Sequence, residues 1–154
     1  MNSISANEIK TIKLSIYRFD PVQDKKPFMQ DFDIDVPADK DLMVLDVLMT
    51  AKEQDPSISF RRSCREGVCG SDGMNINGKN GLGCITPLSD VIKSNKLSLR
   101  PLPGLPVIKE LIVDMKKCVE QYNKIKPYLL KDQTIDERET NTKNISGKKS
   151  GVSN

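Results

Sequence analysis

The chain has 154 residues, which suits one domain of ordinary size with a short extension. Its net charge of +3 is spread over 29% charged residues of both signs, with no basic stripe interleaved with aromatic residues, so we expect no nucleic-acid partner. The absence of histidine excludes histidine-based catalysis and histidine metal ligands, and no apolar run approaches the ~20 residues of a direct membrane span.

Two amphipathic strands are expected near the N-terminus. Residues 11–19 and 28–36 alternate apolar and polar side chains, which is typical of strands with one buried face. The polar residues 20–27 between them predict a turn, and the two strands should therefore form an antiparallel hairpin. The side chains expected to face the core are Ile12, Leu14, Ile16, Phe32, Ile34 and Val36.

A helix is predicted next, over about residues 42–54. Its apolar residues recur at helical spacing, Asp41 can cap its first turn, and Asp55-Pro56 should end it. The apolar residues of this helix are Leu42, Val44, Leu45, Val47, Leu48 and Ala51.

The following segment, residues 60–88, contains three of the four cysteines and most of the glycines. Cys64 and Cys69 are separated by four residues, as are the first two ligands of a plant-type [2Fe–2S] cluster. Where that spacing has a third cysteine, this chain has Asp72, whose carboxylate oxygen can bind ferric iron. With Cys84, the segment supplies four anionic ligands for a [2Fe–2S] cluster. Its glycines allow sharp turns that bring backbone N–H groups toward the cluster sulfurs.

Shorter elements complete the chain. Residues 74–77 and 82–86 flank the turn sequence 78–81 and predict a second hairpin, and residues 97–101 and 111–113 predict two more short strands. Asp114 can cap a last helix that ends before Pro127. Its apolar face carries Met115, Cys118, Val119, Tyr122 and Ile125. Together these elements predict an α+β fold with a β-grasp, ferredoxin-like domain, a short C-terminal helix and a disordered tail.

The segment from Phe60 to Leu88 closely resembles the cysteine loop of the iron–sulfur subunits of succinate dehydrogenase and fumarate reductase. The similarity extends over about residues 10–130 and includes residues 101–104, 111–115 and 122–128. It implies a β-grasp ferredoxin domain whose [2Fe–2S] cluster accepts single electrons from the FAD of a dehydrogenase subunit.

Carried over by motif, the resemblance gives Cys64, Cys69 and Cys84 as ligands, with Asp72 at a position where family members have either Cys or Asp. We expect three segments: a ferredoxin-type domain over 8–106, a strand and helix extension over 107–130, and a tail over 131–154, which has too few apolar residues to form a core and is expected to be disordered.

The resemblance also implies a role. The chain would be the electron-transfer subunit of an enzyme of the tricarboxylic acid cycle, passing single electrons between FAD and downstream clusters and quinone. Its expected partners are the FAD-containing subunit and either membrane-anchor, quinone-binding subunits or a separate cluster-bearing chain. We therefore expect a cytoplasmic location in a reducing compartment, peripheral to the inner membrane through the partner subunits.

The chain departs from that family after the ferredoxin region. Family members continue into a helical domain with further cysteine runs, whereas Cys118 is the only cysteine here beyond Cys84. The relay to quinone therefore needs a second polypeptide or a longer chain. Two other functions stay open: a truncated, non-catalytic binding module, and a stand-alone [2Fe–2S] ferredoxin for another reductase.

Each candidate residue also has a simpler interpretation. The cysteines could form a structural zinc site, and Asp72 could be a solvated turn residue in Ser-Asp-Gly. Cys118 could complete a four-thiolate set, but its place on an apolar helix face favours packing in the core. The arginines before and within the loop could be solvated, or could dock the flavin-bearing subunit or tune the cluster; they are Arg61, Arg62 and Arg65.

Overall fold

The structure, a computed structural model, describes residues 9–92 and 94–127. In chain order its elements are β1 (Ile9–Arg18), β2 (Phe28–Pro37), α1 (Val44–Gln54), β3 (Gly73–Ile76), β4 (Lys79–Leu82), α2 (Leu88–Val91), β5 (Lys96–Arg100), β6 (Val107–Lys109), β7 (Ile112–Val113) and α3 (Lys116–Ile125).

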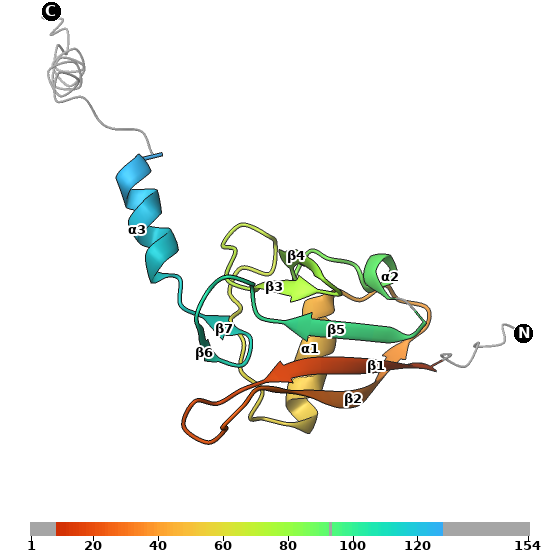
Figure 1. Cartoon of the computed structure of the whole chain (residues 1–154). Helices are drawn as coiled ribbons and strands as arrows, with labels where there is room; N and C mark the ends of the chain where they lie inside the picture. Colours follow the sequence, from red (N-terminus) through yellow and green to blue (C-terminus); the bar gives the residue numbers. More distant parts are fainter. Residues whose placement is uncertain (1–8, 93, 128–154) are drawn as a thin grey trace, which may run out of the picture. The chain divides into compact units, whose positions relative to one another are not determined.

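Five strands form one mixed sheet in the order β2-β1-β5-β3-β4, and α1 crosses it (Figure 1). β1 is antiparallel to β2 and parallel to β5, and β3 is antiparallel to both of its neighbours. The parallel pair at the centre requires a crossover, which α1 and the segments around it provide. The α+β, ferredoxin-like prediction is therefore confirmed.

The N-terminal hairpin has the predicted pattern. Every expected inward side chain of β1 and β2 is buried. β2 lies at the edge of the sheet, and its outward side chains are the exposed carboxylates Asp31, Asp33 and Asp35. The hydroxyls of Thr11 and Ser15 on β1 donate to Asp35 and Asp31 respectively. One face of the hairpin is thus apolar and the other is a hydrogen-bonded polar ladder.

The predicted cap of α1 is wrong. The helix begins one residue after Met43, whose extended backbone bridges to Pro87, and the Asp46 carboxylate accepts the Met43 N–H at 3.1 Å. Asp41 instead accepts hydrogen bonds from the backbone N–H and the hydroxyl of Ser89, in the first turn of α2, at 3.1 and 2.6 Å. Because Met43 is held in an extended bridge to Pro87, α1 begins only after it, and Asp41 caps α2 instead.

The second hairpin is present, with a tighter turn than predicted. β4 already begins at Lys79, and the two turn residues are Asn77 and Gly78, with φ of 48° and 89°. Two positive φ values in an Asn-Gly pair are typical of a type I′ turn, whose twist matches that of the strands. The predicted turn over residues 78–81 is therefore wrong: the turn lies at Asn77-Gly78, and the residues from Lys79 onward already belong to β4.

The core lies between the sheet and α1. It contains the inward apolar side chains of β1 and β2, and Met74, Ile76, Leu97 and Leu99 from β3 and β5. From α1 it contains Val44, Val47, Leu48 and Ala51, whereas Leu42, which precedes the helix, is only partly buried against it. Leu111, in the turn between β6 and β7, also belongs to it. β7 was predicted, but its partner β6, with which it forms a separate two-stranded sheet, was not.

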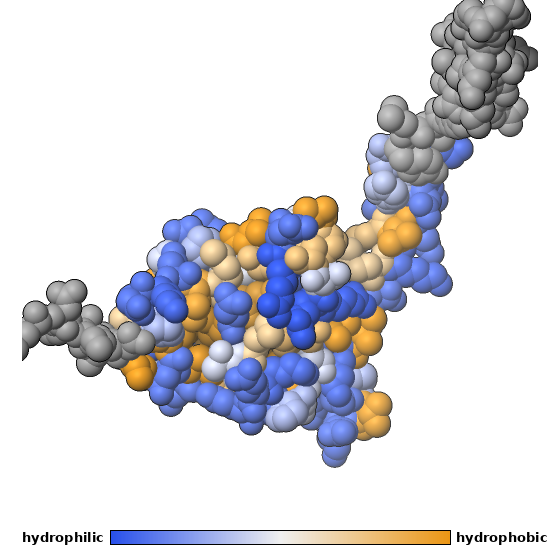
Figure 2. All heavy atoms as spheres, turned by 180° about the vertical axis from the view of Figure 1, so that it is seen from behind, coloured by the Kyte–Doolittle hydropathy of each residue, from blue (hydrophilic) through white to orange (hydrophobic). Residues whose placement is uncertain are grey.

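The residues up to Met115 form one compact unit, and α3 belongs to a second unit that begins at Lys116. α3 ends at Ile125, as predicted from Pro127, but none of its residues is buried. The predicted tail, residues 131–154, lies outside the described residues. One face of the molecule shows hydrophobic patches separated by hydrophilic residues (Figure 2). No helix within residues 9–92 and 94–127 is long and apolar enough to cross a membrane.

Candidate metal centre

The cysteine loop connects the end of α1 to the start of β3. It carries Cys64, Cys69 and Asp72, whereas Cys84 follows β4. The β3–β4 hairpin pairs Gly73 with Leu82, so it returns the chain to the residues that precede β3. Hairpin closure therefore brings Cys84 beside Asp72, although 12 positions separate them.

The first two cysteines form one pair. The sulfurs of Cys64 and Cys69 lie 3.1 Å apart, and the Cys69 N–H donates to the Cys64 sulfur at 3.3 Å. Both are free thiols, Cys69 exposed and Cys64 partly buried. The Ser71 hydroxyl lies 3.1 Å from the Cys69 sulfur. These two thiols therefore face each other at the accessible rim of the loop.

Asp72 and Cys84 form a second pair, which is buried. Asp72 is 3% exposed and Cys84 is 7% exposed. The Asp72 carboxylate accepts the backbone N–H of Cys84 at 2.5 Å, and its backbone carbonyl accepts the N–H of Gly83 at 3.3 Å. Such burial contradicts the interpretation of Asp72 as a solvated turn residue.

The thiols of Cys69 and Cys84 have pKa values that are shifted in opposite directions. Hydrogen bonds with Ser71, first through its hydroxyl and then through its backbone, and further hydrogen bonds with the backbone and thiol of Cys64 lower the pKa of the Cys69 thiol to about 6. Burial raises the pKa of the Cys84 thiol, and the adjacent Asp72 carboxylate raises it further, since a second negative charge beside it is unfavourable. Metal binding must therefore displace a proton from the buried thiol.

Glycine permits the close approach of the loop to Cys84. Gly67 has φ of +77°, and a Cβ there would lie 3.0 Å from the Cδ1 atom of Ile85. A backbone hydrogen bond from Gly67 opposes the effect of burial and lowers the pKa of the Cys84 thiol. An N–H donor on a cluster-binding sulfur is the contact that the glycines of this loop were expected to supply.

The donor set fits a binuclear cluster. A structural zinc site surrounds one ion with four donors. Among the described residues, no group of three or more Cys, Asp, Glu or His side chains lies so as to hold a single metal ion. The four donors here form two pairs, as suits a [2Fe–2S] cluster, in which the protein ligands are divided between two irons.

The fourth cysteine and the three arginines near the loop lie outside the two donor pairs. Cys118 is exposed on α3, so its predicted packing in the core is wrong. Arg61 donates to the Val113 carbonyl oxygen at 2.9 Å, and Arg65 to the Met49 sulfur at 3.1 Å. Arg62 is exposed. A docking or tuning role for these arginines stays a prediction.

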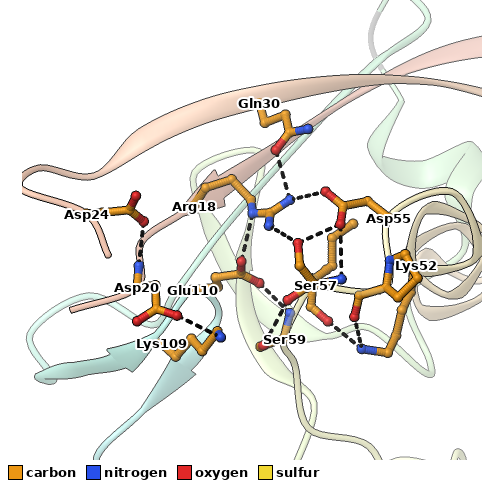
Figure 3. Close-up of polar contacts among 12 residues, drawn as sticks. Arg18, Asp20, Asp24, Gln30, Lys52, Asp55, Ser57, Ser59, Lys109 and Glu110 are labelled. Carbon is orange, nitrogen blue, oxygen red and sulfur yellow. Dashed lines mark hydrogen bonds and ion pairs between the residues drawn. The ribbon is translucent and has the colours of Figure 1, made fainter. Parts of the chain in front are cut away.

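A buried network at the base of the loop was missed. The Arg18 guanidinium contacts Glu110 and Asp55, each through an ion pair, and also Gln30 and Ser57 (Figure 3). Glu110 in turn accepts the backbone N–H of Ser59.

The network connects β1, the end of α1 and the β6–β7 turn to the chain just before Cys64. A signal for it was present in the sequence, because the alternation of β1 places a charged residue, Arg18, at an inward position.

Comparison with known proteins gives a consistent result. The 2Fe-2S iron-sulfur cluster binding domain family matches residues 13–120. The succinate dehydrogenase iron-sulfur subunit of Coxiella burnetii is 55% identical over 125 residues, covering 81% of this chain and 52% of the relative. The mitochondrial succinate dehydrogenase [ubiquinone] iron-sulfur subunit 1 of Oryza sativa is 50% identical over 121 residues, covering 77% and 42% respectively.

A solved structure supports the fold. A chain of the Mycobacterium smegmatis Sdh1 complex in the apo form superposes with a TM-score of 0.68 at 23% identity, covering 84% of this chain and 57% of that one. The chain spans about half the length of the curated relatives it matches.

Proposed function

Since this chain belongs to the 2Fe-2S iron-sulfur cluster binding domain family, we propose that it is the one-electron carrier of a succinate dehydrogenase iron–sulfur subunit. The cofactor of the family is a [2Fe–2S] cluster, which supplies reversible one-electron transfer when bound. The chain itself makes and breaks no substrate bonds. The observation that carries the proposal is the division of four anionic donors into two pairs.

Each pair has its own role. Cys64 and Cys69, at the rim of the loop, would hold one iron, and the buried pair Asp72 and Cys84 would hold the other. The cysteine thiolates match the soft donors that iron–sulfur clusters require, while Asp72 supplies a harder oxygen ligand. The Cys69 N–H donates to the Cys64 sulfur and would stabilise its negative charge, and the backbone hydrogen bond from Gly67 would do the same at Cys84.

The partners follow from the relatives. We expect an FAD-containing dehydrogenase subunit to exchange electrons with the accessible rim that carries Cys64 and Cys69. The electrons would pass on to the clusters and quinone of the remaining subunits or of a second cluster-bearing segment. The described chain would then be peripheral to the inner membrane, held there by those partners.

Asp72 has two possible roles, and two substitutions separate them. In Asp72→Asn the side chain keeps an oxygen that can accept the Cys84 N–H but loses the charge that binds iron. In Asp72→Cys the side chain keeps an anionic ligand but loses the carboxylate acceptor. If Asp72 is a ligand, Asp72→Cys retains two irons per chain and Asp72→Asn does not; if it only braces Cys84, the order reverses.

The test uses the full chain, purified anaerobically and reconstituted with iron and sulfide. We expect two irons and two acid-labile sulfides per chain and, after dithionite reduction, a rhombic S = 1/2 EPR signal of a [2Fe–2S] cluster. Cys118→Ser is the matched control, because it removes a thiol outside the two pairs and should leave the signal unchanged. Protein that binds zinc, or no metal, after careful reconstitution would refute the proposal and favour a non-catalytic binding module.

A further inference from the structure

Within the described part of the chain, Ser71 is the loop residue whose side-chain hydroxyl lies within hydrogen-bond distance of a ligand sulfur. Its hydroxyl oxygen lies 3.1 Å from the Cys69 sulfur. Ser71 is partly exposed and lies between Cys69 and Asp72 in the sequence.

The direction of this hydrogen bond follows from the chemistry of the site. A free thiol and a hydroxyl can each donate to the other. A cysteine that binds iron does so as a thiolate, which has no proton and can only accept. When the site is loaded, the Ser71 hydroxyl must therefore be the donor.

We propose that the Ser71 hydroxyl raises the reduction potential of the cluster by donating a hydrogen bond to the Cys69 sulfur. This inference rests on the proposed function. Reduction adds a negative charge that is shared with the sulfurs, and a donor at a sulfur stabilises the reduced state more than the oxidised state. Ser71 is thus a positioning and tuning residue that acts through Cys69.

The size of the effect can be bounded. Hydrogen bonds to charged groups are stronger than neutral ones, but the oxidised cluster also accepts this bond, so only the difference between the two states matters. We expect loss of the hydroxyl to change the equilibrium constant for reduction by about three- to tenfold, and tenfold corresponds to about 59 mV for one electron.

The experiment compares variants of the full reconstituted chain by EPR-monitored redox titration. Ser71→Ala removes the hydroxyl. Ser71→Thr and Ser71→Val form a pair of nearly equal shape that differs in the hydroxyl alone. Ser63→Ala is the matched control, since Ser63 also adjoins a ligand cysteine but is exposed, and within residues 9–92 and 94–127 the hydroxyl that lies beside a ligand sulfur is that of Ser71.

The expected result is a lower potential in Ser71→Ala and Ser71→Val than in the wild type, with Ser71→Thr and Ser63→Ala close to the wild type. Equal potentials in Ser71→Thr and Ser71→Val would overturn the inference while leaving the proposed function intact. If only the variants with a hydroxyl assemble a cluster, Ser71 is needed for assembly, which would overturn its assignment to tuning. A wild-type chain without two irons would refute the proposed function itself, and iron analysis before the titration identifies that case.

Discussion

Arg18 and Glu110, 92 positions apart in the sequence, form a buried ion pair in which Arg18 Nε donates to Glu110 Oε1 at 2.7 Å. Both residues are more than nine-tenths buried. The remaining guanidinium nitrogens donate to Gln30, Asp55 and Ser57 at 2.5–2.8 Å. The planar guanidinium thus satisfies acceptors from three separate parts of the chain, a geometry that a lysine could not reproduce.

Removal of one partner of this pair should be costly. In Arg18→Met the Glu110 carboxylate stays buried without its counter-charge, and we expect the free energy of unfolding to fall by about 3–5 kcal/mol. Urea denaturation of the chain measures this change. Arg100→Met, on an exposed residue at the end of β5, should change stability by less than about 0.5 kcal/mol.

The double variant Arg18→Met/Glu110→Met completes the comparison. It removes both buried charges, so it should be more stable than Arg18→Met alone. If the loss in the free energy of unfolding of the double variant equals the sum of the losses in the two single variants, the two residues do not interact energetically.

Asp55 should make stability dependent on pH. Hydrogen bonds from the Ser57 hydroxyl and from Arg18 lower the pKa of Asp55 from 3.8 to about 2. A depressed pKa in the folded state stabilises the protein above the ordinary value, and this stabilisation is lost as the pH falls from about 4 through about 2. Because the side chain is partly exposed, we expect about 1–2 kcal/mol.

The measurement compares wild type with Asp55→Asn by urea unfolding at about pH 5 and about pH 2.5. The difference between the two proteins isolates Asp55 from the other carboxylates that titrate in this range. It should be largest at the higher pH and should shrink at the lower one. A difference that is the same at both pH values would contradict the assignment.

Gly67 and Gly70 offer a matched test of the loop. Both have positive φ, 77° and 67°, so alanine at either costs about 1–2 kcal/mol of backbone strain. At Gly67 alone the added Cβ would meet Ile85, 3.0 Å away, beside Cys84. We therefore expect less iron per chain in Gly67→Ala than in Gly70→Ala after identical reconstitution. Equal iron contents would show that the contact with Ile85 is relieved without disturbing Cys84.

Asp41 should stabilise the short helix α2 by accepting hydrogen bonds from Ser89 in its first turn. Hydrogen bonds from the Ser89 hydroxyl and N–H lower the pKa of Asp41, so its carboxylate is charged at neutral pH. Asp41→Ala leaves that N–H without its acceptor and should lower the melting temperature at pH 7, whereas Asp39→Ala, on an exposed neighbour, should not. The same melting temperature in both variants would contradict a capping role.

The periodicity of apolar residues in the sequence was enough to predict β1, β2 and α1. The alternation of β1 and β2 and the helical spacing of α1 identified their buried faces, because those periods reflect which side of the element meets the core. The spacing of Cys64, Cys69, Asp72 and Cys84 likewise identified the candidate ligands. Their division into two pairs depends on closure of the β3–β4 hairpin and could not be predicted from spacing alone.

The errors have a common cause in non-local contacts. Asp41 was assigned to the nearest helix in sequence, but Ser89 is its partner in space. The partner of Arg18 lies in a turn next to a strand, β6, that has only three residues and no alternating pattern. On α3 the apolar face suggested burial of Cys118, although amphipathic spacing shows only which residues share a face and not whether anything covers it.

The acidic outer face of β2 has a consequence for how copies of this chain meet. An edge strand leaves unpaired backbone groups that can recruit a strand from another molecule. Two copies approaching through this edge would bring Asp31, Asp33 and Asp35 of each against those of the other. At neutral pH the repulsion between these like charges opposes such strand addition. The aspartates of β2 therefore protect this edge of the sheet against aggregation.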